Sequence, residues 1–208
     1  MSSVNYNARL PDFLPGRLVL GRGSARDYQS LAAFHYAAGP PATWAAVWVV
    51  RYVEKCVAVS ACGCVGVNPA RTPTPRYADT PTQSAERTVA VAVLSYPVPS
   101  CRPRERWFGL RGTRNENLRF ANANLRTISR VVVHPQFRAL GLSTLLVRCL
   151  CAHGDTRYVE AIAQMGHVHP LFTRAGMIRT NLDHPDEPAY FVLDREAEAE
   201  TTPARRAA

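Results

Sequence analysis

The segment Gln136–Ser143 has the residue types of an anion-binding turn. It follows the strongly β-forming run Thr127–Val133 and precedes leucines at helical spacing, so it joins a predicted strand to a predicted helix. The first backbone N–H groups of a helix have no partner inside the helix, and the helix dipole attracts negative charge to them. Arg138 adds a fixed positive charge, and Gly141 lets the backbone approach a phosphate closely. The segment therefore predicts a site for a phosphate or diphosphate group.

The chain as a whole is strongly basic, which suits the same kind of ligand. Its formal net charge is +9, and most of its basic residues are arginines. A planar guanidinium donates two hydrogen bonds at once to a phosphate, and a basic surface attracts polyanions. Coenzyme A and nucleic acid both fit this charge. A generally basic protein without a specific partner is the alternative.

Length and composition indicate one domain with one core, since the chain has 208 residues and is 47% hydrophobic. No apolar run reaches the roughly 18 residues of a membrane span, and the N-terminal residues do not resemble a signal peptide. We therefore expect a cytoplasmic protein without a membrane partner. The six cysteines are then expected to be reduced, and their Cys-x-Cys spacings do not favour zinc. We expect no metal site, and we place His167 and His169 in a solvated loop.

The remaining pattern predicts strands and helices on both sides of the turn. Strands are expected at residues 18–20, 42–53, 56–67, 88–96, 127–133, 158–162 and 189–193, with 42–53 and 56–67 paired as a hairpin. Helices are expected from Ser24 or Asp27 to Tyr36, at 141–152 and at 170–175. Residues 97–106 are predicted to be irregular, and 115–125 have no assigned structure.

The domain organisation follows from composition. Residues 68–86 are rich in proline, threonine, serine and arginine, so we predict a flexible surface insertion there. Residues 1–17 are assigned to an N-terminal extension, 18–194 to a single domain and 195–208 to a disordered tail.

Arg138, Gly141 and Ser143, preceded by Val-Val-Val-His-Pro, resemble motif A of the Gcn5-related N-acetyltransferases (GNAT). That motif ends in glycine or alanine, so Ser143 is a departure from it. The segment Phe172–Met177, with its Gly-Met ending, fits the closing short helix of the family. The resemblance implies an α/β fold with a mixed sheet, the GNAT-like acyl-CoA N-acyltransferase fold. The alternative interpretation of the segment Gln136–Ser143 is an ordinary strand-to-helix turn that binds no ligand.

The resemblance also implies a cofactor, acetyl-CoA or a related acyl-CoA. Its pyrophosphate would lie on the turn, and its pantetheine arm would pair with the strand before the turn. The implied coenzyme-binding residues are Val131, Val132, Val133, Arg138, Ala139, Leu140, Gly141, Leu142 and Ser143.

The general acid that is usual in the family has no counterpart in this chain. Many members place a tyrosine where the alignment puts Phe172, and a phenyl ring cannot donate a proton. Either other residues move or orient protons, or the chemistry is not a simple acetyl transfer. Each candidate residue also has an ordinary structural explanation. The candidates are His35, Tyr36, Ser129, Tyr158 and Glu160, with Tyr158 as the replacement acid.

Three longer segments are similar to a narrower group of proteins. Residues 34–42, 126–133 and 160–166 with 172–177 are similar to acetyltransferase-like domains associated with ABC-type ATPases and to phage Mom proteins, which modify adenine in DNA. The resemblance implies a nucleic-acid base as acceptor and a carbamoylmethyl group on the adenine amine as product. A basic stretch with aromatic residues could hold the strand while a base is flipped. The nucleic-acid-binding candidates are Arg102, Arg104, Arg106, Trp107, Arg111 and Arg114.

Three hypotheses follow for the function. The first is a Mom-like enzyme that transfers an acyl-CoA-derived group to a base, with adenine in DNA as the expected acceptor. The second is an ordinary acetyl-CoA-dependent N-acetyltransferase that acts on a protein or a small-molecule amine. The third is a catalytically silent binding domain that retains the fold.

Overall fold

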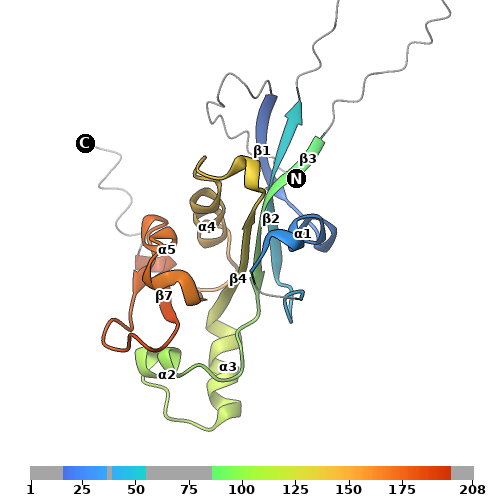
Figure 1. The fold of residues 1–208 in the computed structure, drawn as a ribbon. Helices are drawn as coiled ribbons and strands as arrows, with labels where there is room; N and C mark the ends of the chain where they lie inside the picture. Colours follow the sequence, from blue (N-terminus) through green and yellow to red (C-terminus); the bar gives the residue numbers. More distant parts are fainter. Residues whose placement is uncertain (1–15, 37–38, 55–85, 198–208) are drawn as a thin grey trace, which may run out of the picture.

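A seven-stranded mixed sheet forms the centre of the computed structural model, which describes residues 16–36, 39–54 and 86–197 (Figure 1). The strands are β1 (Gly16–Arg22), β2 (Ala46–Glu54), β3 (Glu86–Ser95), β4 (Leu125–Val133), β5 (Tyr158–Ala163), β6 (Ile178–Arg179) and β7 (Ala189–Asp194). Their order across the sheet is β1-β2-β3-β4-β5-β7-β6. All neighbouring strands are antiparallel except β4 and β5, which are parallel.

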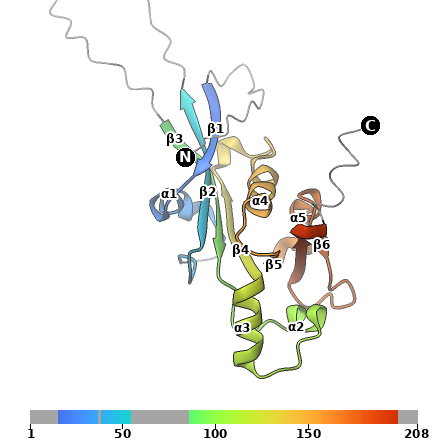
Figure 2. The same ribbon diagram turned by 180° about the vertical axis from the view of Figure 1, so that it is seen from behind.

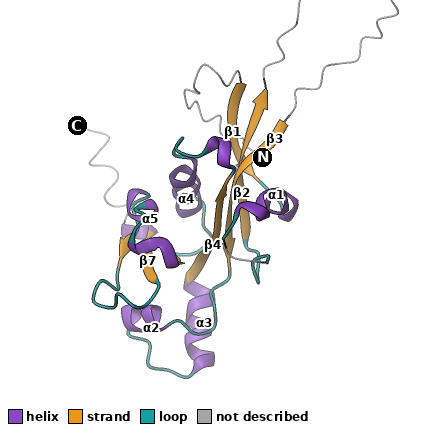
Figure 3. Cartoon of the chain, in the orientation of Figure 1, coloured by secondary structure: helices purple, strands orange, loops and turns teal. Residues whose placement is uncertain are grey.

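Helices cover both faces of this sheet (Figures 1 to 3). They are α1 (Ala25–Leu31), α2 (Arg102–Phe108), α3 (Arg114–Asn124), α4 (Leu142–Ala152) and α5 (Leu171–Arg174), with the 3-10 helices η1 (Ala32–Phe34), η2 (Pro135–Phe137) and η3 (Gln164–His167). The apolar residues of α4 and α5 form the main core with one face of the strands. On the other face, α1 packs on β2 and β3, and Cys101 and Phe108 at the two ends of α2 pack on β5 and β7.

The order of elements after β4 is the one that the resemblance to the GNAT fold predicts. A strand leads through a turn into the amphipathic helix α4, and β5, the short helix α5 and Gly176–Met177 follow. The predicted α/β fold class with a mixed sheet is therefore confirmed. None of the described helices has the length and apolar composition needed to cross a membrane.

The predicted hairpin between residues 42–53 and 56–67 is wrong for its first strand. β2 pairs with β1 along one edge and with β3 along the other, so no edge is left for a neighbour in the chain. Residues 56–67 and 68–85 lie outside the described residues, and Glu86, assigned to the insertion, begins β3. Periodicity identifies strands, but the choice of partner depends on contacts that are distant in sequence.

The segment between β3 and β4, predicted to be irregular or unassigned, contains α2 and α3. Helix α3 begins with a capping box, in which Thr113 N–H donates to Glu116 Oε2 at 2.7 Å and Glu116 N–H donates to Thr113 Oγ1. Its sequence is polar on nearly all sides, so hydrophobic periodicity gave no signal. Helix α2 begins with Arg102-Pro103, and proline is favoured in a first helical turn.

Candidate active site

The parallel strands β4 and β5 separate part of the way along their length. Their ladder runs from the Leu125–Tyr158 pair to the Ile128–Ala161 pair. Beyond it, β4 continues to Val133 with β3 on its other edge, and β5 continues with β7. The edge of β4 that faces the gap therefore carries backbone groups that an extended ligand can pair with.

A β-bulge lies at the start of this gap. Arg130 is opposite Val93 and Ile128 is opposite Leu94, so Ser129 is the extra residue on β4. A bulge redirects side chains and ends regular pairing. Here it coincides with the point where β4 and β5 part.

A pocket of about 150 Å³ occupies the gap. Its walls come from segments that are far apart in the sequence: the end of η1, β4, the end of β5 with η3, and the start of α5. The lining residues are His35, Tyr36, Ile128, Ser129, Arg130, Val131, Ile162, Ala163, Met165, Gly166, His169, Leu171 and Phe172. The structure thus brings together His35, Tyr36 and Ser129 from the predicted catalytic set.

The pocket has walls on both faces of the sheet. Val131 and Phe172 belong to the core beneath α4 and α5. His35 and Tyr36 follow η1 on the face covered by α1, where their rings stack with centroids 4.6 Å apart. Two different ligands could therefore reach the pocket, one from each face of the sheet.

Ser129 can accept a hydrogen bond in the pocket but cannot donate one. Ser95 Oγ lies 2.6 Å from the Thr43 carbonyl, so Ser95 uses its only proton there. The 2.6 Å contact between the two serine hydroxyls then requires Ser129 to donate to Ser95. Ser129 Oγ can therefore accept a hydrogen bond from the N–H of a bound amine. The predicted role of orienting an acyl carbonyl would require Ser129 to donate a proton that it already donates to Ser95.

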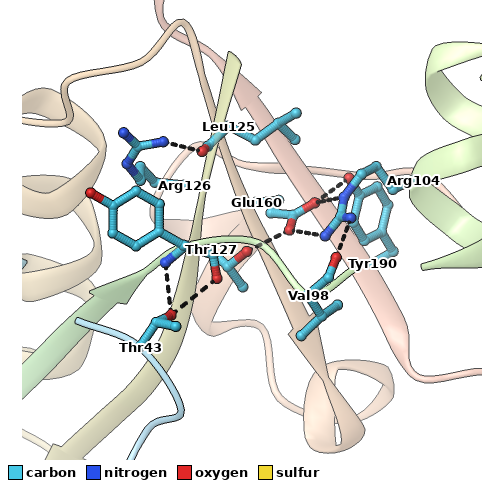
Figure 4. Close-up of polar contacts among 9 residues, drawn as sticks. Thr43, Val98, Arg104, Leu125, Arg126, Thr127, Glu160 and Tyr190 are labelled. Carbon is cyan, nitrogen blue, oxygen red and sulfur yellow. Dashed lines mark hydrogen bonds and ion pairs between the residues drawn. The ribbon is translucent and has the colours of Figure 1, made fainter. Parts of the chain in front are cut away.

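Glu160 and Tyr158 do not line the pocket. Glu160 is fully buried and accepts hydrogen bonds from Arg104 Nε at 2.9 Å and Nη2 at 2.6 Å, from Tyr190 at 2.7 Å and from Thr127 at 2.5 Å (Figure 4). All its acceptor positions face these donors, so the predicted proton-transfer role is corrected to a structural ion pair.

Tyr158 begins β5, four residues before Ile162, and is therefore about 13 Å from the pocket end of that strand. Its ring packs edge-on against Phe108 at 5.0 Å. The prediction of Tyr158 as the replacement acid is not supported by this position.

The predicted nucleic-acid-binding arginines separate into two groups. Arg104 is 2% exposed, and Arg104 Nη1 also donates to the Val98 carbonyl at 2.7 Å, so it is wrong as a surface contact. The other predicted residues are exposed on α2, on α3 or on the connection between them. Of these, Arg106 forms an ion pair with Glu187, and Trp107 is about half exposed. The group that can contact a polyanion is Arg102, Arg111 and Arg114, together with Arg119.

The turn before α4 has the local geometry that the sequence predicts. Gly141 is the N-cap of α4 in the left-handed conformation, with φ 74°, and Leu145 N–H makes the first helical bond, to the Gly141 carbonyl. The amides of Leu142, Ser143 and Thr144 therefore precede the first internal bond. Phe137 is fully buried beneath the turn and anchors it, whereas Arg138 is exposed.

Arg130, Met165 and His169 line the pocket but were not among the predicted site residues. Arg130 lies in a run assigned to regular strand, and it borders the gap because it lies beyond the last β4–β5 pair, Ile128–Ala161. His169 was assigned to a solvated loop; it is exposed, and it precedes Pro170, the N-cap of α5. His167, which was assigned to the same loop, instead forms hydrogen bonds with Arg179 Nη2 through Nδ1 and with the Glu187 carbonyl through Nε2.

Cys149 in α4 is buried and unsuited to nucleophilic chemistry. Burial raises the pKa of its thiol to about 11. We expect alkylation of Cys149 by iodoacetamide at pH 8 to be at least roughly a hundredfold slower than for an exposed thiol, because the thiolate is the reacting form. Peptide mass spectrometry in native buffer and in urea measures this rate, and equal rates in the two conditions would contradict it.

Across residues 16–36, 39–54 and 86–197, no three His, Cys, Asp or Glu side chains gather closely enough to hold a metal ion. Cys56, Cys62 and Cys64 lie outside those ranges.

Comparisons with known proteins show a likeness of fold. No family model and no curated protein matches the chain. The KacTA–DNA complex contains a chain that is 11% identical, with 89% of this chain and 98% of that chain covered and a TM-score of 0.44. An agmatine N-acetyltransferase mutant in its apo form is 14% identical, with 85% and 99% covered and a TM-score of 0.43.

Proposed function

We propose that this protein is an acyl-CoA-dependent N-acyltransferase whose acceptor is a nucleic-acid base. The observation that carries the proposal is the pocket in the gap between β4 and β5, which lies on the open edge of β4, the strand that leads to the turn before α4. Bound acyl-CoA would supply an activated thioester carbon to this pocket.

The residues of the turn fit a diphosphate. A Cβ added at Gly141 meets no atom within 4 Å, so the space above this turn is open. Unbonded helix amides point to that space, and the exposed guanidinium of Arg138 lies in the same turn. Gly141, Leu142 and Ser143 would hold the phosphates, Ala139 and Leu140 would shape the turn, and Val131 to Val133 would pair with the pantetheine arm.

The charge of the pocket favours a neutral acceptor amine. Among the described residues that line it, none is Asp or Glu, whereas Arg130 and two histidines are present. A cationic amine would meet no counter-charge there, and Arg130 would repel it. The exocyclic amine of a nucleobase is neutral, which is the reason we prefer it to a lysine or a polyamine.

The pocket's own residues can then orient the acceptor and take its proton. Ser129 Oγ can accept from the amine N–H, and His169 or the stacked pair His35 and Tyr36 can take the amine proton. As the N–C bond forms, the thioester C–S bond would break, and the proton would pass to the departing coenzyme A thiolate directly or through water. The adenine amine is a weak nucleophile because its lone pair is delocalised into the ring. Positioning and desolvation therefore have to supply most of the rate.

The experiment that tests the function is mass spectrometry of nucleosides from DNA of cells that express the protein. A deoxyadenosine whose exocyclic amine carries an acyl group is the expected result, because attack on a thioester carbon joins the amine to a carbonyl. A carbamoylmethyl adduct, which is joined through a methylene carbon, would also show that the base is modified, but by a reaction other than acyl transfer. Unmodified DNA together with newly acetylated protein lysines would favour the ordinary N-acetyltransferase. If acetyl-CoA produces no heat in a calorimetric titration, the silent binding domain is the better account.

Helix α2 packs on the sheet face that also carries η1, and α3 leads directly into β4. A strand held by their exposed arginines would approach the pocket from the side of His35 and Tyr36. We expect the double change Arg111→Gln, Arg114→Gln to weaken binding of a DNA duplex and to reduce the slope of log K against log salt by about 2, because each lost phosphate contact removes about one unit. Fluorescence anisotropy at several salt concentrations measures the slope. An unchanged slope would exclude this surface.

A further inference from the structure

Arg130 lies in the half of the pocket that is on the acceptor side. Its partner on β3 is Val93, which belongs to the core beneath α1, so the two side chains are on the face that carries η1. The next residue, Val131, belongs to the opposite core beneath α4. Both line the pocket, and the guanidinium is therefore on the side of His35 and Tyr36, away from the turn that would hold the coenzyme.

The guanidinium of Arg130 uses only one of its two hydrogen-bonding edges. Nη1 donates to the Ser129 carbonyl at 2.8 Å. Nε is buried and makes no hydrogen bond with any residue in the described part of the chain. Nη2 also makes none with the described residues, but it is not among the buried unpaired atoms. A buried donor without an acceptor costs free energy, so a group that accepts at this edge would be bound favourably.

Arg104 shows in the same molecule what this edge can hold. Its Nε and Nη2 donate to the two oxygens of Glu160, at 2.9 and 2.6 Å, as a planar fork. The described lining of the pocket contains no carboxylate that could play this part for Arg130. A ligand that carries an oxyanion with two oxygens at fork spacing would match this edge.

We propose that Arg130 forms an oxyanion subsite that binds a phosphate of a nucleotide acceptor while the amine of its base enters the pocket. This proposal rests on the proposed function, since it assigns how the acceptor is held. Nη2 reaches the phosphate directly, and a small rotation of the side chain brings Nε to a second oxygen. The same cation selects against protonated amines, so one residue both recognises the acceptor and excludes competitors.

The test is a calorimetric titration of the full chain with matched anionic and neutral probes. The first pair is deoxyadenosine 5′-monophosphate and deoxyadenosine, and the second is benzoate and benzamide, which asks whether a carboxylate is preferred. Wild type is compared with Arg130→Gln, Arg130→Lys and the control Arg17→Gln. Arg17 is an exposed arginine on the edge strand β1, so its loss changes the net charge equally without touching the pocket.

We expect the monophosphate to bind wild type more tightly than the nucleoside by about ten- to a hundredfold, because one charged hydrogen bond contributes about this much and the second, from Nε, requires the side chain to rotate. Arg130→Gln should remove this difference and leave nucleoside binding unchanged, Arg130→Lys should keep part of it, and Arg17→Gln should keep all of it. Equal binding of the two adenine probes to wild type would overturn the subsite. The subsite would also be overturned if Arg130→Gln and Arg130→Lys weakened binding of the monophosphate and the nucleoside equally. A benzoate-to-benzamide affinity ratio larger than the monophosphate-to-nucleoside ratio would overturn it as well.

An acetyl-CoA titration of the same four proteins keeps this result separate from the proposed function. Failure of wild type to bind acetyl-CoA would refute the acyltransferase, yet the difference between the adenine probes would still report on Arg130. Normal acetyl-CoA binding with no such difference would refute only the subsite.

Discussion

Replacing Gly141 by valine is expected to weaken acetyl-CoA binding by at least about a hundredfold. The side chain would enter the open space above the turn, and losing two charged hydrogen bonds to a phosphate costs about 3 kcal/mol. A β-branched residue also cannot adopt φ 74° without strain, so the N-cap itself would change. Calorimetric titration with acetyl-CoA measures the effect.

Gly109 provides a matched control for that experiment. It ends α2 with φ 61°, and a Cβ added there also meets no atom within 4 Å. Gly109→Val therefore introduces the same kind of backbone strain at a distance from the gap. We expect this variant to bind acetyl-CoA like wild type, and comparable losses in both variants would show that the effect at Gly141 is one of folding only.

The second large effect is expected for Arg104→Met, which should lower the free energy of unfolding by about 3–5 kcal/mol. The change leaves Glu160, fully buried, without its opposite charge. Tyr190 cannot compensate, because burial and the neighbouring Glu160 hold the pKa of its phenol well above the usual range and keep it a neutral donor. Urea unfolding followed by circular dichroism measures the loss.

Two further variants identify the cause of that loss. Arg106→Met removes an arginine of the same helix whose ion pair with Glu187 is exposed, and exposed pairs contribute little to stability. It should unfold nearly as wild type does. The double change Arg104→Met, Glu160→Gln removes both charges and should recover much of the loss; equal destabilisation of the single and double variants would argue against an unpaired charge as the cause.

The buried Arg104–Glu160 pair also explains how the segment of α2 and α3 is joined to the strands that frame the pocket. Arg104 comes from α2 and Glu160 from β5, and Thr127 on β4 donates to the same carboxylate (Figure 4). The pair thus joins α2 to β4 and β5 at the Thr127–Glu160 position, one pair before the two strands part. A polyanion bound on α2 and α3 would therefore rest on the same strands that frame the pocket.

The sequence by itself determined the turn Gln136–Ser143, the strand before it and the helix after it. These depend on interactions within a few residues: β-branched side chains, a glycine that accepts positive φ and leucines at helical spacing. The order of elements from β4 to Gly176 followed from the same local signals. Local chemistry is sufficient there because each signal and the structure it specifies lie in one segment.

Only the tertiary structure decided which side chains meet. Glu160 lies in a strand and its charge partner lies 56 residues earlier in a helix without an amphipathic pattern, so no local signal joined them. The bulge at Ser129 belongs to the register of β4 on β3, and Arg130 lines the pocket because β4 extends beyond its ladder with β5. Strand pairing and burial are properties of contacts between distant segments, and a single sequence read along its length does not contain those distances.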